Sequence, residues 1–326
     1  VLHGIDLSIE RGEAVGLVGE SGCGKSVTWL AALGLLPKKA SISGSVLLEG
    51  TELLTASRST LENVRGGRIA MIFQDPSSSL NPVIRVGRQI EEAVQLHRRL
   101  KGPAARAEAL RLMELVGIPD AARRIDNYPH EFSGGQNQRL MIAMALAGNP
   151  DILIADEPTT ALDATIQAQI LDLLAALRAE TGMAVVFISH DLGAVSQICE
   201  RVSVMYAGRI VEQARTEALF AAPRHPYTHG LFDSIPSLDG GRNRLIPIEG
   251  TVPEPGKLPP GCAFSPRCLS ASDLCARSFP RFGVPQDDAG EGRMVACFHP
   301  YPAASHLLPS MGGRVSIPPR KRATAQ

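Results

Sequence analysis

A glycine-rich segment between residues 19 and 26 has the spacing of a phosphate-binding loop. It reads Gly-Glu-Ser-Gly-Cys-Gly-Lys-Ser and fits G-x-x-x-x-G-K-[ST] at every fixed position. An apolar run at 14–18 precedes it and a helix-forming run follows it, which is the strand–loop–helix context that this chemistry requires. A glycine-rich turn without a ligand is the alternative. The segment predicts a site for a nucleoside triphosphate, made by Gly19, Glu20, Ser21, Gly22, Cys23, Gly24, Lys25 and Ser26.

Each residue type in that loop has a physical role in holding phosphate. The glycines let successive backbone N–H groups point inward and form an anion site at a helix N-terminus. Lys25 would reach the β- and γ-phosphates, and the Ser26 hydroxyl would ligate Mg²⁺.

Polar residues that would act on a bound triphosphate follow three apolar runs. Asp156 ends the run 152–156 and would hold the water shell of Mg²⁺, while Glu157 would act as general base on the attacking water. Gln74 follows the strand-like run 68–73 and would contact the metal ion or the attacking water. We therefore count Gln74, with Ser26 and Asp156, among the predicted Mg²⁺ residues. His190 follows another run and would contact the γ-phosphate. Ordinary turn or edge residues are the alternative for all four, but the phosphate loop favours a catalytic interpretation.

A second predicted anion site opens the helix expected at 137–147. Ser133 offers a hydroxyl, and Gly134 and Gly135 offer backbone N–H groups, just before Gln136. Because the first loop is already a complete cradle, this second site is predicted to serve another nucleotide.

The elements that must position these residues alternate between strands and helices. Apolar runs of strand length occur at 5–9, 14–18, 45–48, 68–73, 152–156 and 184–189, and a hairpin is expected at 202–206 and 209–212. From Val86 to Gly117 the apolar spacing becomes helical, which predicts two amphipathic helices within an inserted helical subdomain at about 76–150. Such alternation predicts an α/β fold with a mostly parallel sheet.

Composition narrows the class of protein. The chain has 326 residues, of which 44% are hydrophobic, and its 33 basic and 33 acidic residues cancel. The balanced charge gives no reason to expect a nucleic-acid partner. No apolar run is long enough to span a membrane and no signal peptide is recognised, so we expect a cytosolic protein that can sit on a membrane partner. Val1 opens directly into a strand-like stretch, so we also expect a truncated N-terminus.

Taken together, the motifs resemble the ATP-binding cassette of ABC transporters over residues 1 to about 220. The matching segments are the Walker A loop at 19–26, the Q-loop at Gln74, the signature motif at 132–136 with Phe132 for leucine, Walker B at 152–157, the D-loop at 161–163 and the switch histidine at His190. This resemblance implies ATP and Mg²⁺ as ligands, a nucleotide contact for Asp163, and two cassettes paired head to tail, each signature closing on the partner's γ-phosphate. The aromatic residue that stacks on adenine in this family would precede the first residue of the sequence.

The composition changes beyond residue 220. Prolines gather and periodicity fades, which predicts an irregular module at 221–305, followed by a tail at 306–326 that is expected to be disordered. His225-Pro226-Tyr227 resembles the segment that follows the cassette in ATPase subunits of oligopeptide and dipeptide importers.

Four cysteines belong to this module, and five, six and twenty-one residues separate them in turn: Cys262, Cys268, Cys275 and Cys297. Four thiolates suit a tetrahedral metal or an iron–sulfur cluster, and a reducing cytosol disfavours disulfides. The resemblance favours a 4Fe–4S cluster with a structural role; zinc and plain thiols are the alternatives.

These features predict an ATP-hydrolysing subunit of a bacterial importer for di- or oligopeptides, at the cytoplasmic face of the inner membrane. Its expected partners are a second cassette subunit, identical or not, two membrane permeases and, indirectly, an extracytoplasmic substrate-binding protein. Nickel or glutathione import is the alternative within the same subfamily. A cassette in DNA repair or on ribosomes would carry a long coiled-coil insertion or two fused cassettes, and a regulatory cassette commonly lacks Glu157 or His190. Neither pattern occurs.

Overall fold

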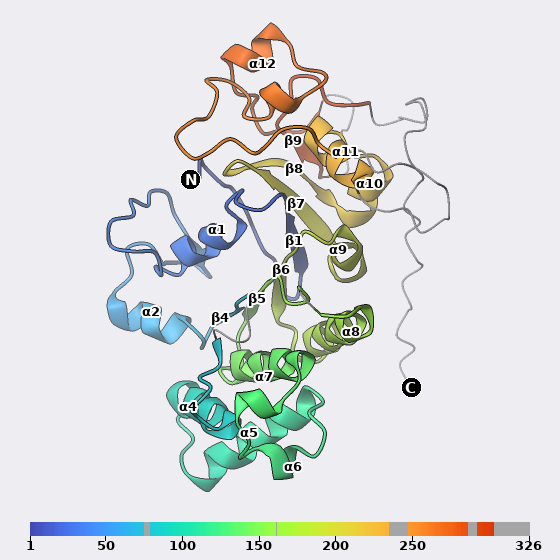
Figure 1. Cartoon of the computed structure of the whole chain (residues 1–326). Coiled ribbons are helices and arrows are strands. Elements are labelled where there is room, and N and C mark those ends of the chain that lie inside the picture. Colours follow the sequence, from blue (N-terminus) through green and yellow to red (C-terminus); the bar gives the residue numbers. More distant parts are fainter. Residues whose placement is uncertain (75–78, 161, 235–246, 286–291, 303–326) are drawn as a thin grey trace. The chain divides into compact units, whose positions relative to one another are not determined.

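The computed structural model describes residues 1–74, 79–160, 162–234, 247–285 and 292–302 (Figure 1). They form two compact units. The unit that we name the P-loop unit contains Val1–Ser8, Val15–Lys25 and Ser189–Gln326, and the helical unit contains Ile9–Ala14 and Ser26–Ile188. The expected tail at 306–326 and the D-loop residue Ala161 lie outside the described residues.

Three parallel strands form the centre of the helical unit. Strand β5 (Ile152–Asp156) lies between β4 (Ile69–Ile72) and β6 (Ala184–Ile188), with Asp156 opposite Ile188. Their residues are almost all buried, as expected of parallel strands that are covered on both faces. The parallel arrangement predicted from the apolar runs is therefore confirmed, and β5 delivers Asp156 at its carboxyl end.

Helices make up most of the rest of this unit. Helix α1 (Lys25–Ala32) follows the phosphate loop, and α8 (Ala164–Thr181) follows β5 and carries Asp163 as its N-cap. Helix α2 (Arg58–Val64) and the short antiparallel pair β2 (Leu47–Leu48) and β3 (Thr51–Glu52) lie before β4. The strand expected at 45–48 is thus only two residues long.

The predicted insert contains α4 (Val86–Arg98), α5 (Pro103–Leu115), the short α6 (Ala121–Arg124) and α7 (Gly134–Leu146), which Figure 1 shows grouped together. Apolar residues of these helices, such as Ile90, Val94, Leu112 and Leu140, are at most 1% exposed. The two amphipathic helices predicted between residues 86 and 117 are confirmed as α4 and α5. Helix α7 begins three residues earlier than expected because Ser133 caps it.

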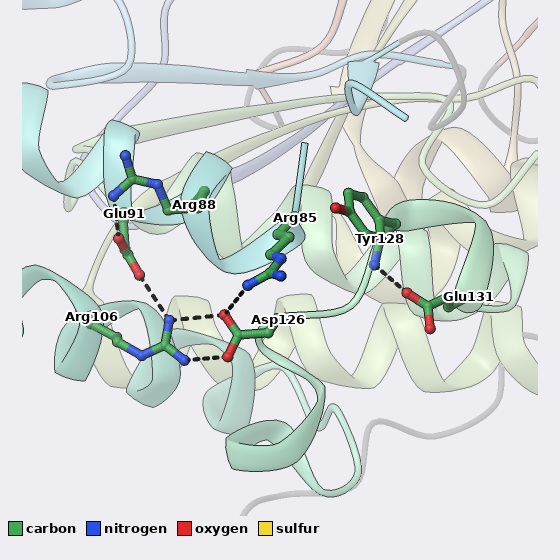
Figure 2. Close-up of polar contacts among 7 residues, drawn as sticks. All are labelled: Arg85, Arg88, Glu91, Arg106, Asp126, Tyr128 and Glu131. Carbon is green, nitrogen blue, oxygen red and sulfur yellow. Dashed lines mark hydrogen bonds and ion pairs between the residues drawn. The ribbon is translucent and has the colours of Figure 1, made fainter. Parts of the chain in front are cut away.

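Polar side chains join the helices of the insert (Figure 2). The Arg106 guanidinium donates to both carboxylate oxygens of Asp126, at 3.2 and 2.7 Å, and also contacts Glu91 at 3.4 Å. Glu91 is buried and accepts a further contact from Arg88 at 3.2 Å. Arg106 therefore links α5 to α4 and to the segment that follows α6.

The P-loop unit also contains paired strands. Strand β1 (Ala14–Val18) runs parallel to β7 (Arg201–Tyr206), which forms an antiparallel hairpin with β8 (Arg209–Arg215). The predicted hairpin is confirmed. Strand β9 (Met294–Val295) then pairs with β8 and ties the C-terminal part of the chain to these strands.

Short helices complete the P-loop unit: α9 (Leu192–Ile198), α10 (Thr216–Ala221), α11 (Pro226–Asp233), the 3-10 turn η2 (Ser265–Arg267) and α12 (Asp273–Arg277). The strand expected at 5–9 is wrong, because the described residues before β1 contain no strand. That stretch is held by scattered contacts instead, such as the one from the Arg201 side chain to the Ser8 carbonyl at 2.6 Å. Among all described residues, no helix is both long and apolar enough to cross a membrane.

Candidate nucleotide site

The phosphate loop lies between β1 and α1, and its glycines are required by its shape. A Cβ atom at Gly19 would lie 2.2 Å from the Met205 carbonyl oxygen, so no side chain fits there. Gly22 has a φ of 78°, in the left-handed region that glycine adopts without strain. The local sequence therefore gives a tight backbone curl at the end of a buried strand.

Lys25 turns its ammonium group back into this curl. The Nζ atom donates to the carbonyl oxygens of Gly19 at 2.8 Å and Glu20 at 3.1 Å, and lies 3.8 Å from the Cys23 thiol. Burial raises the pKa of that thiol, which keeps Cys23 neutral. Lys25 is only 6% exposed, and no described carboxylate pairs with it. A buried cation without a counter-charge suits an anion, so the loop fits a phosphate group.

Glu157 occupies a strained position directly after β5. Its φ of 48° lies in the left-handed region, which is uncommon for a residue other than glycine and is typical of functional sites. The carboxylate oxygen Oε2 accepts hydrogen bonds from Gln74 Nε2 at 3.0 Å and from Thr160 Oγ1 at 2.9 Å. The backbone N–H of Glu157 donates to the Ile188 carbonyl at 2.9 Å. These contacts fix where the carboxylate points.

The structure thus brings together two of the predicted catalytic residues, Gln74 and Glu157. Gln74 was expected to sense metal or water, and here its amide donates to the expected base. Thr160 was missed by the sequence reasoning, although a hydroxyl three residues after an acidic residue at a strand end is a usable signal. Asp156 itself is 5% exposed at the end of β5, and Ser26 is partly buried in α1.

The second predicted anion site lies at the start of α7. Ser133 Oγ accepts from the Gln136 backbone N–H at 3.3 Å, and Gln136 Oε1 accepts from the Ser133 backbone N–H at 3.2 Å. This reciprocal pair caps the helix. Ser133 and Gly134 are exposed, and a Cβ atom at Gly134 would meet no atom within 4 Å. The helix end is therefore formed and accessible.

The remaining predicted residues lie at helix starts. Asp163 accepts the backbone N–H groups of Thr165 and Ile166, at 3.1 and 3.0 Å, and so caps α8. Next to it, Ile166 packs so closely on Gly135 that a Cβ atom there would lie 2.6 Å from the isoleucine side chain. His190 is exposed and lies two residues beyond β6.

Two side chains from the C-terminal part of the P-loop unit contact the phosphate loop at Glu20. Tyr227 Oη accepts the Glu20 backbone N–H at 2.8 Å, and the Arg267 guanidinium donates to both Glu20 carboxylate oxygens at 2.7 and 3.0 Å. Sequence reasoning noted Tyr227 without giving it a contact and missed Arg267, since no local pattern links either residue to the loop.

The four C-terminal cysteines line one cavity, together with His225, Phe264 and His299. Burial raises the pKa values of Cys262 and Cys268, and raises that of Cys297 to about 12, with the neighbouring thiols adding to the effect. The free space is about 10 Å³, close to what a single water molecule needs. Among the described residues, no three Cys, His, Asp or Glu side chains are arranged to hold a metal ion. The thiols therefore converge, but they do not form the ligand geometry that the sequence led us to expect.

Comparison with known proteins places this geometry in a family. A family model described as ABC transporter matches residues 2–160, and one described as oligopeptide/dipeptide transporter, C-terminal region, matches residues 211–275. A Brucella abortus protein named for peptide import and ATP binding is 53% identical over 277 residues, which is 85% of this chain and 83% of that protein. The dipeptide transport ATP-binding protein DppD of Bacillus subtilis is 47% identical over 281 residues, covering 86% and 84%.

Solved structures agree with this placement. A dimeric ATP-binding cassette in a post-hydrolysis state, bound to ADP and Pi, is 29% identical with a TM-score of 0.59, and the match covers 66% of this chain and 90% of that one. Family models, relatives and structure all point to the same kind of protein. This chain belongs to the ABC transporter family and is one of its ATP-hydrolysing subunits.

Proposed function

We propose that this chain powers the import of di- or oligopeptides as the ATPase subunit of a membrane transporter. The observation that carries the proposal is the match of residues 211–275 to the C-terminal region of oligopeptide and dipeptide transporters, joined in one chain to a cassette. Relatives with peptide-transport names at 47% and 53% identity support the same substrate class.

For hydrolysis we assign roles to the residues of the candidate nucleotide site. Lys25 and the loop N–H groups would bind the β- and γ-phosphates, and Ser26 and Asp156 would hold Mg²⁺, which would supply positive charge to offset that of the phosphates. Glu157 takes a proton from the attacking water at its carboxylate. Gln74 and Thr160 donate to Oε2 of that carboxylate, at 3.0 and 2.9 Å, and so keep it in place. His190 contacts the γ-phosphate.

A second cassette completes the site. The exposed start of α7, at Ser133 and Gly134, would offer backbone N–H groups to a nucleotide held by that partner, together with Gly135 and Gln136. Asp163, at the start of α8, would also contact nucleotide. Two cassettes, identical or not, would thus close head to tail on ATP and separate after hydrolysis. Binding shifts the population toward the closed pair only because both subunits contact the same phosphates.

The insert transmits this motion to two permease subunits at the cytoplasmic face of the inner membrane, where the chain binds as a peripheral protein. Two of its apolar side chains support this role because they are far more exposed than core residues. Val83, just before α4, is 79% exposed, and Leu96, in α4, is 72% exposed. An extracytoplasmic substrate-binding protein would deliver the peptide to the permeases.

Reconstituted transport tests this function. The chain would be combined in lipid vesicles with the permeases and the binding protein encoded by neighbouring reading frames. We expect ATP-dependent accumulation of labelled di- and oligopeptides, and no accumulation with Glu157→Gln. Accumulation of nickel or glutathione in place of peptides would overturn the substrate class, and neighbouring frames without permeases would overturn import itself.

The cysteine cavity is proposed to hold a 4Fe–4S cluster with a structural role. Four thiols in one cavity are the donor set that such a cluster uses, and a bound cluster would stabilise a segment with few core residues. Because the free space is about 10 Å³, the side chains of Cys262, Cys268, Cys275 and Cys297 must move apart to accept it.

Metal analysis of anaerobically purified protein tests the cluster. We expect iron and labile sulfide in the wild type and their loss in Cys297→Ser. Cys199→Ser is the matched control, because Cys199 is buried but does not line the cavity. A colourless protein that contains zinc, or one that contains no metal, would contradict the proposal.

A further inference from the structure

Glu20 is an acidic residue inside the loop that must accept a polyanion. A free carboxylate there would repel the phosphates, because two like charges a few ångströms apart near a protein surface interact by several times the thermal energy. The phosphate pattern leaves this position open to any residue, so the pattern itself does not require an acid. What surrounds Glu20 therefore decides whether it opposes nucleotide binding.

Arg267 neutralises this carboxylate by forming a bidentate ion pair with it. Its Nη1 and Nη2 atoms donate to Oε2 and Oε1 of Glu20 at 2.7 and 3.0 Å, and its side chain is only 5% exposed. The contact raises the pKa of Arg267 above its ordinary value. Bidentate pairs between arginine and a carboxylate are among the strongest charge-assisted hydrogen bonds.

The guanidinium group is itself held in place. Nε donates to the Glu249 carbonyl at 2.8 Å, Nη2 donates to the Ile248 carbonyl at 3.2 Å, and Nη1 donates to Tyr206 Oη at 3.3 Å. A side chain fixed at several points loses little further entropy on pairing, so it positions Glu20 rather than following it.

Tyr227 holds the backbone of the same residue. Its hydroxyl accepts the Glu20 N–H at 2.8 Å, and its ring, which is fully buried, packs against Tyr206 and Phe264 with centroids 4.6 and 5.4 Å apart. The Glu20 carbonyl in turn accepts from Lys25 Nζ at 3.1 Å. Tyr227 and Arg267 both belong to residues 221–305, which we name the C-terminal module. Glu20 therefore connects this module to the lysine that would contact the phosphates.

We propose that Arg267 and Tyr227 are positioning residues of the nucleotide site, and that Arg267 offsets the charge of Glu20 so that the loop accepts a triphosphate. This inference goes beyond peptide import and does not depend on which solute is transported. It makes the C-terminal module a part of the ATP site, in a chain whose nucleotide motifs all lie before residue 191.

Binding of a fluorescent ATP analogue to the full chain tests the proposal. We expect Arg267→Gln to weaken binding by about tenfold or more, since it leaves a bare carboxylate in the loop. Glu20→Gln is expected to bind at least as tightly as the wild type. The double variant is expected to recover affinity to within about threefold, because no charge then remains unpaired.

The series ATP, ADP and AMP separates charge compensation from simple loss of structure. With Arg267→Gln the loss of affinity should fall as phosphates are removed, whereas misfolding of the loop would weaken all three nucleotides alike. Tyr227→Phe should weaken all three by a smaller factor, because it leaves the Glu20 N–H without its acceptor.

Arg277→Gln is the matched control, because Arg277 lies in the same module and pairs at 3.8 Å with the exposed Asp273. Its affinity for ATP should equal that of the wild type. Arg267→Lys keeps the positive charge but cannot donate to both carboxylate oxygens at once, so its ATP affinity should lie between those of the wild type and Arg267→Gln. It replaces Arg267→Gln in the test if that variant does not fold. Unchanged binding by Arg267→Gln, or a double variant as weak as the single one, would overturn the proposal.

Discussion

At the scale of single residues, the carboxylate proposed as the catalytic base combines a strained backbone with firm support. A residue other than glycine in the left-handed region costs about 1–3 kcal/mol, and Glu157 has a φ of 48°. Hydrogen bonds from Gln74 and Thr160 to its carboxylate, and from its own N–H to the Ile188 carbonyl, hold it there. Such support is expected where the direction of one side chain matters more than local stability.

Replacing that carboxylate tests its role as the base. Glu157→Gln keeps the shape of the side chain but removes its ability to accept a proton, so kcat should fall by about 10²–10⁴-fold while ATP binding persists. Steady-state phosphate release and equilibrium ATP binding measure the two effects. Thr160→Val, which removes one donor to the carboxylate, should lower kcat much less. Unchanged turnover in Glu157→Gln would mean that another group acts as base.

At the scale of elements, the insert depends on a buried acid that two arginines share. Glu91 is 5% exposed and receives contacts from Arg88 and Arg106, while Arg106 also holds Asp126 (Figure 2). Removing Arg106 would leave Asp126 with Arg85 at 3.6 Å and Glu91 with Arg88. The two helices α4 and α5 would lose their shared ionic contact.

Arg106→Gln should therefore lower the free energy of unfolding by about 1–3 kcal/mol, because a buried acceptor loses a charged donor. Urea denaturation followed by circular dichroism measures it. Arg58→Gln is the matched control: Arg58 pairs with Glu62 at 2.7 Å on an exposed face, where such pairs contribute less than about 1 kcal/mol. An equal decrease in unfolding free energy in the two variants would show that the contacts of Arg106 between helices stabilise the fold no more than an exposed ion pair does.

The same contact predicts a dependence on pH. The hydrogen bonds from Arg106 hold the pKa of Asp126 below its ordinary value. As the pH falls through the ordinary pKa of an aspartate, the Asp126 carboxylate of the unfolded chain binds a proton before that of the folded chain does. The stability that the Arg106–Asp126 pair contributes at higher pH is therefore lost as the pH falls toward the lowered pKa of the folded state. The difference in unfolding free energy between the wild type and Arg106→Gln should be smaller at low pH than at pH 7, as urea titrations at both values would show. A constant difference would exclude Asp126 as its source.

At the scale of the whole molecule, one nucleotide must be contacted by two chains for the proposed cycle to work. Gly134 is a suitable position at which to test this contact. It is exposed, and a Cβ atom added there would have no atom of its own chain within 4 Å. A methyl group at this site leaves the monomer intact, and alanine is a better helix former than glycine. In the proposed closed pair, it would nevertheless occupy space that the phosphates of the partner's nucleotide need.

Gly134→Ala should consequently keep the stability and the ATP affinity of the monomer but fail to dimerise with ATP. Light scattering of the Glu157→Gln background, with and without Gly134→Ala, measures this. Gly283→Ala is the control, because that glycine also has open space at its Cβ but lies in the C-terminal module. A dimer of normal strength in Gly134→Ala would exclude close approach at this helix end.

The sequence by itself determined those features whose physics is local. A strand, a curled glycine loop and a helix N-terminus are contiguous, so the loop at 19–26 and the helix start beside Ser133 could be predicted without a fold, although the capping pair that sets the first residue of α7 was not. Apolar periodicity likewise predicted α4, α5 and the parallel strands, because buried faces repeat with the period of each element.

Only the tertiary structure decided the contacts between distant segments. Gln74 meets Glu157 across 83 residues, and Arg267 meets Glu20 across 247, distances along the chain at which no local pattern constrains a pair. The run 5–9 has strand-like residues but no strand, since pairing depends on a neighbour that spacing alone does not specify. The cysteines show the same division: their number was evident from the sequence, whereas the size of the cavity between them follows from packing.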